Sequence, residues 1–219
     1  MNLSFTEENY LKIIYSLSTA SSDNATSTNE ISEKYQTKPS SVSDMLKRLS
    51  EKCLIEYEKY KRVSLTEEGS RRAIQIIRKH RLWEVFLHEN LHFTWDEVHE
   101  LAEQLEHIQS QVLIERLDAF LGYPEFDPHG DPIPNAEGSF KNQKKTLLSQ
   151  MEPGTLCRIV AVKDSSSSFL QYLQKLHLGI GSKIKILEVM SFDDSYTIEN
   201  EIGIKISISQ KFAENLFVQ

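Results

Sequence analysis

Imidazole and carboxylate side chains recur at helical spacing in the middle of this chain. Six residues take part: His80, Glu84, His99, Glu103, Glu106 and His107. Positions i, i+4, i+7 and i+8 share one face of a helix, and the last four of these residues have that spacing. The first two stand at i and i+4 of a preceding helix. Imidazoles and carboxylates without a thiolate suit Mn²⁺, Fe²⁺, Co²⁺ or Zn²⁺, so two such faces packed together could hold one or two divalent cations.

The same residues also have a plain structural interpretation and an enzymatic one. Acidic surface helices often carry Glu at this spacing, and a His beside them is usually solvated. A di-metal carboxylate enzyme would carry Glu-x-x-His on two helices, whereas Glu103 and His107 are four residues apart. The zinc-protease pattern H-E-x-x-H also fails, because Glu103 stands where the second His is needed. No glycine-rich phosphate loop or nucleophile motif is found, so we expect the chain not to be an enzyme.

The first 70 residues have the element order of a winged helix-turn-helix. In sequence order we expect a helix over 5–18, a short helix over 28–36, a helix opening at 38–41 and a β-hairpin over 55–65. Pro39 and the serines after it are a typical helix start. In such folds the second helix of the pair enters the major groove of DNA.

The predicted DNA contacts lie on the exposed face of that helix and at the tip of the hairpin. They are Lys38, Pro39, Ser40, Ser41, Ser43, Asp44, Lys47, Lys59, Lys61 and Arg62. The three basic residues of the hairpin would reach phosphates. Residues 1–81 hold 14 Lys and Arg against 11 Asp and Glu, whereas residues 82–219 hold 11 against 21. An anionic partner is therefore expected to meet the N-terminal part, although winged helices also serve as protein-interaction modules.

In the rest of the chain, the pattern of apolar residues changes from one typical of helices to one typical of strands. Residues 69–120 are predicted to be helical throughout, and 122–139 form a loop with four of the six prolines. From 153 onward, alternating apolar and polar residues predict a five-stranded SH3-like barrel interrupted by one helix. The fold class is therefore mostly α with small β parts (α+β). The expected domains are a DNA-binding domain 1–70, a metal-binding and dimerisation domain 71–140, a linker 141–152 and the SH3-like domain 153–219.

Several protein classes are disfavoured by the composition. The first residues lack a basic stretch followed by an apolar run, so no signal peptide is expected. No run of 18 apolar residues suggests a membrane span. Two cysteines, Cys53 and Cys157, lie far apart and form neither a disulfide framework nor a C-x-x-C site. These features suit a cytoplasmic protein.

Three stretches together resemble one protein family. The stretch KPSSVSDMLKRLSEKCLIEYEKYKRVSLTEEG is followed by RKHRLWEVFL with VHELAEQLEH, and then by DPHGDPIP. With the C-terminal barrel, this combination resembles the diphtheria-toxin-repressor family of metal-dependent transcriptional repressors over the whole chain. It is most similar to the manganese transport regulator branch that carries a C-terminal SH3-like domain.

The resemblance implies a homodimer that binds double-stranded operator DNA and controls metal-uptake genes, with neither a membrane nor a small organic substrate as partner. Mn²⁺ would be the corepressor, with Fe²⁺ as the alternative and Zn²⁺ or Co²⁺ able to substitute in vitro. The six residues named above would be ligands, and Glu103, where iron regulators have Cys, favours manganese. The family draws a further ligand from the first helix at the position of Asn9, with Glu8 as the alternative here. Asp164 matches a ligand from the SH3-like domain, and His129 is expected to be structural.

Two alternatives stay open beside the metal-dependent regulator. One is a metalloenzyme that uses the same His and Glu cluster. The other is a constitutive DNA-binding protein in which the metal is only structural. The apolar residues of 108–121 are expected to form the dimer face.

Overall fold

The computed structural model describes residues 3–58 and 61–219 of the chain. It divides into two compact units. The N-terminal unit comprises Met1–His80, Gln104–Ser110 and Pro134–Ser139, and the C-terminal unit comprises Arg81–Glu103, Gln111–Ile133 and Phe140–Gln219. Among the described residues, no helix combines the length and the apolar character that crossing a membrane requires.

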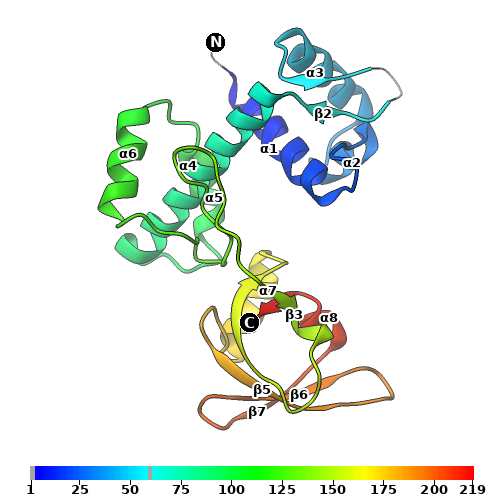
Figure 1. Cartoon of the computed structure of the whole chain (residues 1–219), viewed down its shortest axis with the longest axis vertical. Helices are drawn as coiled ribbons and strands as arrows, with labels where there is room; N and C mark the ends of the chain where they lie inside the picture. Colours follow the sequence, from blue (N-terminus) through cyan, green and yellow to red (C-terminus); the bar gives the residue numbers. More distant parts are fainter. Residues whose placement is uncertain (1–2, 59–60) are drawn as a thin grey trace. The chain divides into compact units, whose positions relative to one another are not determined.

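The N-terminal unit contains the predicted helices and the hairpin (Figure 1). They are α1 (Phe5–Ala20), α2 (Thr28–Lys34), α3 (Pro39–Glu51), β1 (Ile55–Glu56) and β2 (Ser64–Leu65). Ser4 and Glu7 form a capping box that starts α1, and Ser27 and Glu30 do the same for α2. Pro39 occupies the first turn of α3, where its missing N–H costs nothing.

An apolar core joins the three helices to the hairpin. Leu11 and Ile14 of α1 and Leu46 and Leu49 of α3 are completely buried. The strands pair antiparallel with Ile55 opposite Leu65, and a bridge between Thr26 and Val63 ties the hairpin to the segment before α2. This arrangement confirms the predicted winged helix-turn-helix. Lys59, predicted to lie at the hairpin tip, falls outside the described residues.

The middle of the chain is broken twice where one helical stretch was expected. Its helices are α4 (Glu67–Leu91), α5 (Val98–Leu105) and α6 (Gln111–Phe120). His92 ends α4 in the left-handed backbone conformation, with φ of 58°. After α5 the chain leaves the helix at Leu105, so Glu106 and His107 do not share a helical face with His99. The predicted four-residue face is therefore wrong, and its members fall into separate groups.

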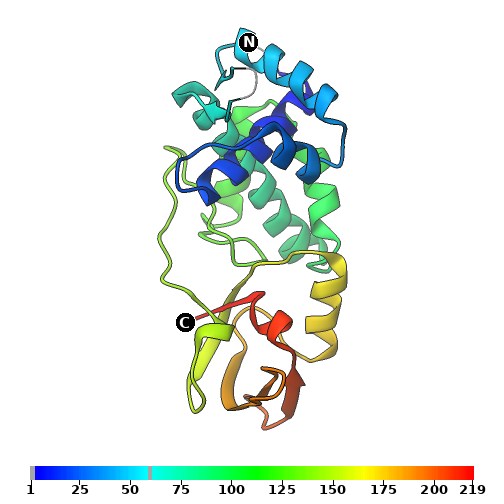
Figure 2. The same ribbon diagram turned by 90° about the vertical axis from the view of Figure 1, so that its right-hand side faces the viewer.

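The C-terminal unit ends in a six-stranded antiparallel sheet. Its strands are β3 (Thr146–Leu147), β4 (Leu156–Val162), β5 (Lys183–Val189), β6 (Tyr196–Asn200), β7 (Lys205–Ile208) and β8 (Leu216–Val218), in the order β3-β8-β4-β5-β6-β7. Figure 2 shows the C-terminus beside β3, which pairs with β8. The helices of this region are η1 (Leu148–Gln150), α7 (Ser167–Lys175) and α8 (Gln210–Ala213).

One strand more than expected is present because part of the expected linker is ordered. Leu148 of η1 is completely buried in the same core as Ile184, Ile198 and Leu216. Leu170 and Leu173 of α7 are buried in this core as well. Alternation along β4 to β7 places these side chains inward, as the period of two predicts.

Candidate metal centre

Four buried side chains of the N-terminal unit form two carboxylate–imidazole pairs. We name Glu8, His80, Glu106 and His107 the α1 cluster. His107 Nδ1 lies 2.5 Å from Glu8 Oε2, and His80 Nδ1 lies 2.6 Å from Glu106 Oε2. Phe5 stacks on the His107 ring at 4.3 Å between centroids and shields it from water. Each pair thus joins a carboxylate to an imidazole at a place of low solvent access.

Asn9 adds an acceptor that lacks a donor. Its Oδ1 is buried and has no hydrogen-bond partner among the residues the structure describes. A buried carbonyl oxygen without a donor is costly, and a cation would satisfy it. Glu8 is also turned inward, where Gln109 Nε2 donates to its Oε1 at 2.7 Å. Asn9 Oδ1 and the side chain of Glu8, the two alternative candidates from the first helix, are therefore both buried.

Two lysines surround the acidic members of the α1 cluster. Lys12 Nζ lies 2.9 Å from Glu106 Oε1 and 2.8 Å from Oε2. Burial would raise the pKa of Glu106, but its hydrogen bond with His80 and the charge of Lys12 keep that pKa below its ordinary value. Burial lowers the pKa of Lys79, against the charges of Glu8 and Glu106. Glu106 is consequently ionised and available as a ligand at neutral pH.

A second group lies in the C-terminal unit. Glu84, Asp127 and His129, named here the loop cluster, are all buried and offer one ligand atom each within 4.8 Å of one another. His129 Nδ1 lies 3.7 Å from Glu84 Oε1. His99 Nδ1 approaches the same oxygen to 3.3 Å from the half-exposed side of the group. Two imidazoles and two carboxylates again match the ligand preference of borderline and hard cations.

The proline-rich loop places His129 by its backbone. Asp127 Oδ1 accepts hydrogen bonds from the backbone N–H of His129 and of Asp131, both at 2.9 Å. Gly130 has φ of 83°, and a Cβ there would meet the carbonyl oxygen of Val160 at 2.0 Å. Only glycine permits this close approach to β4. The loop is therefore held against the sheet, with the His129 ring turned inward.

Electrostatics at the loop cluster retain protons that a bound cation would have to displace. Burial raises the pKa of Asp127 to about 7, with help from the charges of Glu84 and Asp131. Burial would lower the pKa of His129, but its hydrogen bond with Glu84 and the charges of Glu84 and Asp127 raise that pKa to about 9. Because a metal-bound imidazole must be unprotonated, a cation at this cluster would replace the His129 proton.

The remaining predicted ligands lie in weaker positions. Glu103 is exposed, and its Oε1 lies 3.7 Å from His99 Nε2. Asp164 accepts a hydrogen bond from the backbone N–H of Ser166 and, among the described residues, does not belong to the loop cluster. His129 was expected to be structural. The sequence feature that could have identified it as a candidate ligand is its position between Asp127 and Asp131 in an ordered loop.

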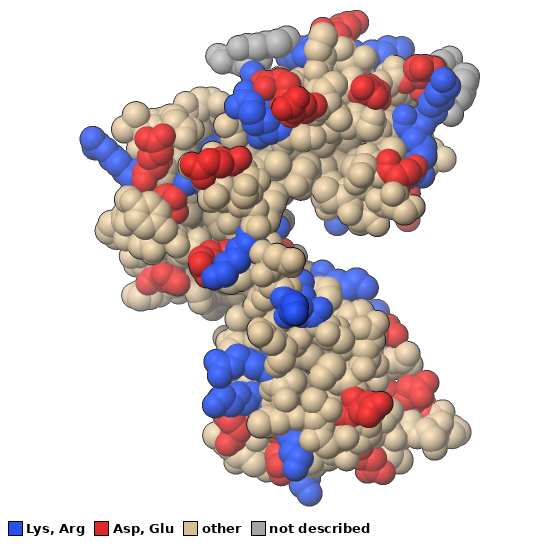
Figure 3. Space-filling view, viewed as in Figure 1, with Lys and Arg blue, Asp and Glu red and all other residues tan. Residues whose placement is uncertain are grey.

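The predicted DNA contacts on α3 are open to solvent. Lys38, Ser40, Ser41, Asp44 and Lys47 are exposed, and Ser43 is half-buried because its Oγ donates to the carbonyl of Pro39 at 3.0 Å. Arg48 is exposed on the same helix and was not predicted. On the face shown in Figure 3, basic side chains alternate with acidic ones.

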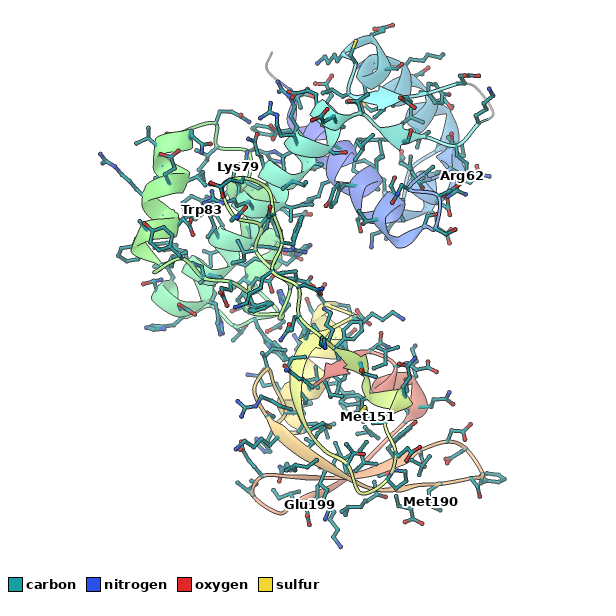
Figure 4. The ribbon with its side chains drawn as sticks, in the orientation of Figure 1. Arg62, Lys79, Trp83, Met151, Met190 and Glu199 are labelled. Carbon is teal, nitrogen blue, oxygen red and sulfur yellow. The ribbon has the colours of Figure 1, made fainter. Side chains whose placement is uncertain are left out.

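The basic residues of the hairpin already have local partners. Arg62 Nε lies 2.9 Å from Asp23 Oδ2, and the guanidinium also donates to the carbonyl of Ala25. Figure 4 shows Arg62 at this position. Lys61 pairs with Glu58 at 2.5 Å. Arg62 therefore braces the hairpin, so a phosphate contact from it requires exchange of these partners.

Comparison with known proteins identifies the family that the sequence resembles. Residues 2–63 match the family described as "Iron dependent repressor, N-terminal DNA binding domain", and residues 66–135 match "Iron dependent repressor, metal binding and dimerisation domain". The iron-dependent repressor IdeR of Mycobacterium leprae is 30% identical over 162 residues, which cover 71% of this chain and 70% of that protein. The chain belongs to the iron-dependent repressor family. Its residues 146–219 match the FeoA domain, which accounts for the SH3-like sheet.

A solved structure extends the likeness within the iron-dependent repressor family. It is described as a manganese-dependent transcriptional repressor in complex with manganese, is 31% identical with a TM-score of 0.86, and covers 97% of this chain and 98% of that one. A Chlamydia trachomatis relative named "Probable metal transport system membrane protein" is 44% identical over 71 residues, or 32% of this chain, which spans only 16% of its length. Members of the iron-dependent repressor family are transcriptional repressors, so the enzymatic alternative falls away.

Proposed function

We propose that this chain is a homodimeric repressor that binds operator DNA when Mn²⁺ occupies the α1 cluster. The observation that carries the proposal is the buried, donorless Oδ1 of Asn9, the residue that follows Glu8 of that cluster on α1. These groups fit a divalent cation in number and chemistry. Fe²⁺ is the second choice, because the ligand set contains no thiolate. The regulated genes would be those for metal uptake, read from DNA in the cytoplasm.

The ligands of the proposed site come from separate segments. Glu8 and Asn9 belong to α1, which shares an apolar core with α3. His80 lies in the middle of α4, and His107 follows the end of α5. A bound cation would supply positive charge that draws these oxygens and nitrogens into one coordination shell. Glu8 and Asn9 would thereby fix α1, and with it α3, relative to the segment around Glu106. Operator half-sites lie about 34 Å apart, so a small change in the angle of α3 alters DNA binding.

The loop cluster is proposed as a second cation site. Glu84, Asp127 and His129 supply buried ligand atoms, and His99 and Glu103 lie on its open side. Its residues tie α4 to the loop that contacts β4. A cation there would hold the loop in place without touching α1, so we assign it a supporting role.

The dimer face is proposed on α6. Val112 and Phe120 expose 58% and 67% of their surface on that helix, and a second copy packed there would bury this apolar surface. A two-fold dimer places two α3 helices on neighbouring turns of DNA.

DNA binding with and without metal tests the proposal. A duplex selected from a random-sequence library in the presence of Mn²⁺ is titrated with the protein in excess Mn²⁺ and in EDTA, with fluorescence anisotropy as the readout. We expect at least tenfold tighter binding with Mn²⁺, and by linkage the DNA should tighten Mn²⁺ binding by the same factor. Equal affinity in the two conditions would refute the corepressor role.

Variants separate a sensor from a structural metal site. His107→Ala should lose the metal response and keep the fold, whereas His88→Ala, an exposed residue outside both clusters, should respond as the wild type does. A structural metal in a constitutive DNA-binding protein would exchange too slowly to follow added EDTA within minutes. Loss of DNA binding within minutes after EDTA therefore supports the sensor.

A further inference from the structure

Lys12 occupies the position that a cation would take on Glu106. Its Nζ lies within 2.9 Å of both carboxylate oxygens, while Glu106 is completely buried and Lys12 is 18% exposed. His80 Nδ1 takes a further position on Oε2 at 2.6 Å. Both oxygens of the carboxylate are thus in contact with groups of this chain.

Few lone-pair positions remain open on the carboxylate of Glu106. An ionised carboxylate accepts at about four lone-pair positions, and Lys12 and His80 already use three. A divalent cation coordinated by Glu106 would also stand beside an ammonium in a buried site, where like charges repel strongly. Lys12 and a cation therefore exclude one another at this carboxylate.

Lys12 shares its helix face with the candidate ligands. It follows Glu8 and Asn9 by four and three positions on α1, and residues at that spacing are neighbours on a helix. The same face of α1 thus carries both the ligands and their competitor. Partial exposure of Lys12 lets the ammonium leave towards water by side-chain rotation alone.

We propose that Lys12 is a built-in competitor of the metal, filling the place of a cation on Glu106 in the metal-free protein and leaving when Glu106 becomes a ligand. This inference rests on the proposed metal site at the α1 cluster. It has two consequences: the metal-free protein keeps its buried Glu106 neutralised, and the affinity for metal is lower than the ligands alone would give.

Lys79 separates a direct contact from a general charge effect. It also interacts electrostatically with Glu8 and Glu106, but its Nζ lies 3.5 Å from the backbone carbonyl of Ile108. Figure 4 shows Lys79 on α4. Lys52 provides a second comparison, because it pairs with buried Glu7 at 2.6 Å, outside the α1 cluster. Each of these lysines can be replaced by Gln with the same change of charge.

The affinity for Mn²⁺ is measured by competition with a fluorescent chelator. We expect Lys12→Gln to bind Mn²⁺ about tenfold more tightly than the wild type, equivalent to roughly 1.4 kcal/mol. Lys79→Gln should have a smaller effect, and Lys52→Gln none. Lys12→Arg, which keeps the charge, should bind as weakly as the wild type or more weakly. In a Glu106→Gln background, Lys12→Gln should no longer increase the affinity.

Thermal unfolding provides a second readout. Lys12→Gln should unfold at a lower temperature than the wild type in EDTA, and Mn²⁺ should raise its unfolding temperature by more. A lysine with only a structural role would lower stability without tightening metal binding. The inference is overturned if Lys12→Gln binds Mn²⁺ no more tightly than the wild type, or if Lys79→Gln matches its gain. Failure of wild-type DNA binding to respond to Mn²⁺ would instead refute the proposed function.

Discussion

At the scale of single residues, the candidate site depends on groups whose hydrogen bonding or pKa is altered by burial. Asn9 keeps an acceptor away from water without a donor, and His129 keeps a proton well above its ordinary pKa. Glu103, which suggested manganese, is exposed and lies beside His99. Its residue type still favours a hard cation, but its position gives it less influence than the buried carboxylates have.

Asn9 can be tested by changing its charge. Asn9→Asp should bind Mn²⁺ roughly tenfold more tightly, because added ligand charge strengthens the binding of hard cations. Asn9→Ala should bind more weakly than the wild type. Both affinities are measured by isothermal titration calorimetry. Asn29→Asp adds the same charge at an exposed position of α2 and should change nothing. Equal affinities of Asn9→Asp and Asn9→Ala would exclude Asn9 as a ligand.

His129 should make metal binding depend on pH. Its pKa of about 9 means that the ring is protonated at neutral pH and must lose that proton to become a ligand. Binding at the loop cluster therefore releases protons, and the apparent affinity should increase as the pH is raised from 7 towards 9. Calorimetry in buffers of different ionisation enthalpy counts the protons released. His129→Gln should release fewer, and an unchanged number would contradict the assignment.

At the scale of elements, local signals predicted the helices better than the breaks between them. Capping residues and apolar spacing identified α1 to α3 and the hairpin. Residues 69–120, expected to be helical throughout, are interrupted where His92 adopts a left-handed backbone and where Glu106 turns inward to Lys12 and His80. Those contacts join residues far apart in the chain, so the spacing of apolar residues along the sequence does not predict them.

Glu7 links the start of α1 to the end of α3. Its carboxylate accepts a hydrogen bond from the backbone N–H of Ser4 and pairs with Lys52 at 2.6 Å. Burial would raise the pKa of Glu7, but the hydrogen bond from Lys52 and those from Ser4 keep it lowered. The resulting stability is present above the ordinary carboxyl pKa and is lost as pH falls through the lowered value.

Glu7→Gln should therefore unfold about 1–2 kcal/mol more easily at pH 7 and lose less stability on acidification than the wild type. Chemical denaturation at several pH values measures both effects. Glu33→Gln, at an exposed position of α2, is the matched control. Parallel pH profiles of Glu7→Gln and the wild type would show that the ion pair does not contribute.

At the scale of the whole molecule, the proposed regulation depends on a dimer that presents two α3 helices to one DNA duplex. The apolar residues of α6 are available for that contact, and α3 presents small polar and basic side chains to solvent. The net charge of −7 does not by itself favour DNA binding, but the distribution of charge does, since the positive excess is confined to residues 1–81.

Phe120→Glu should disrupt the dimer, because burying a carboxylate in an apolar interface is strongly unfavourable. Sedimentation equilibrium should show the monomer at micromolar concentration, and Mn²⁺-dependent DNA binding should weaken at least tenfold. Phe192→Glu, at a residue 97% exposed in the C-terminal sheet region, controls for the charge. A dimeric Phe120→Glu protein would place the interface elsewhere.

The sequence by itself determined the fold class, the family and most of the ligand types, because capping, periodicity and residue chemistry are local properties of the chain. Tertiary structure decided which candidate ligands lie close together. It paired His107 with Glu8 and His80 with Glu106, added Asp127 and His129 to Glu84, and placed Lys12 on Glu106. These pairings depend on burial and on contacts between distant segments, which change the pKa of a group and the partners it can reach. The spacing of residues along one helix predicts neither the pKa of a group nor its partners.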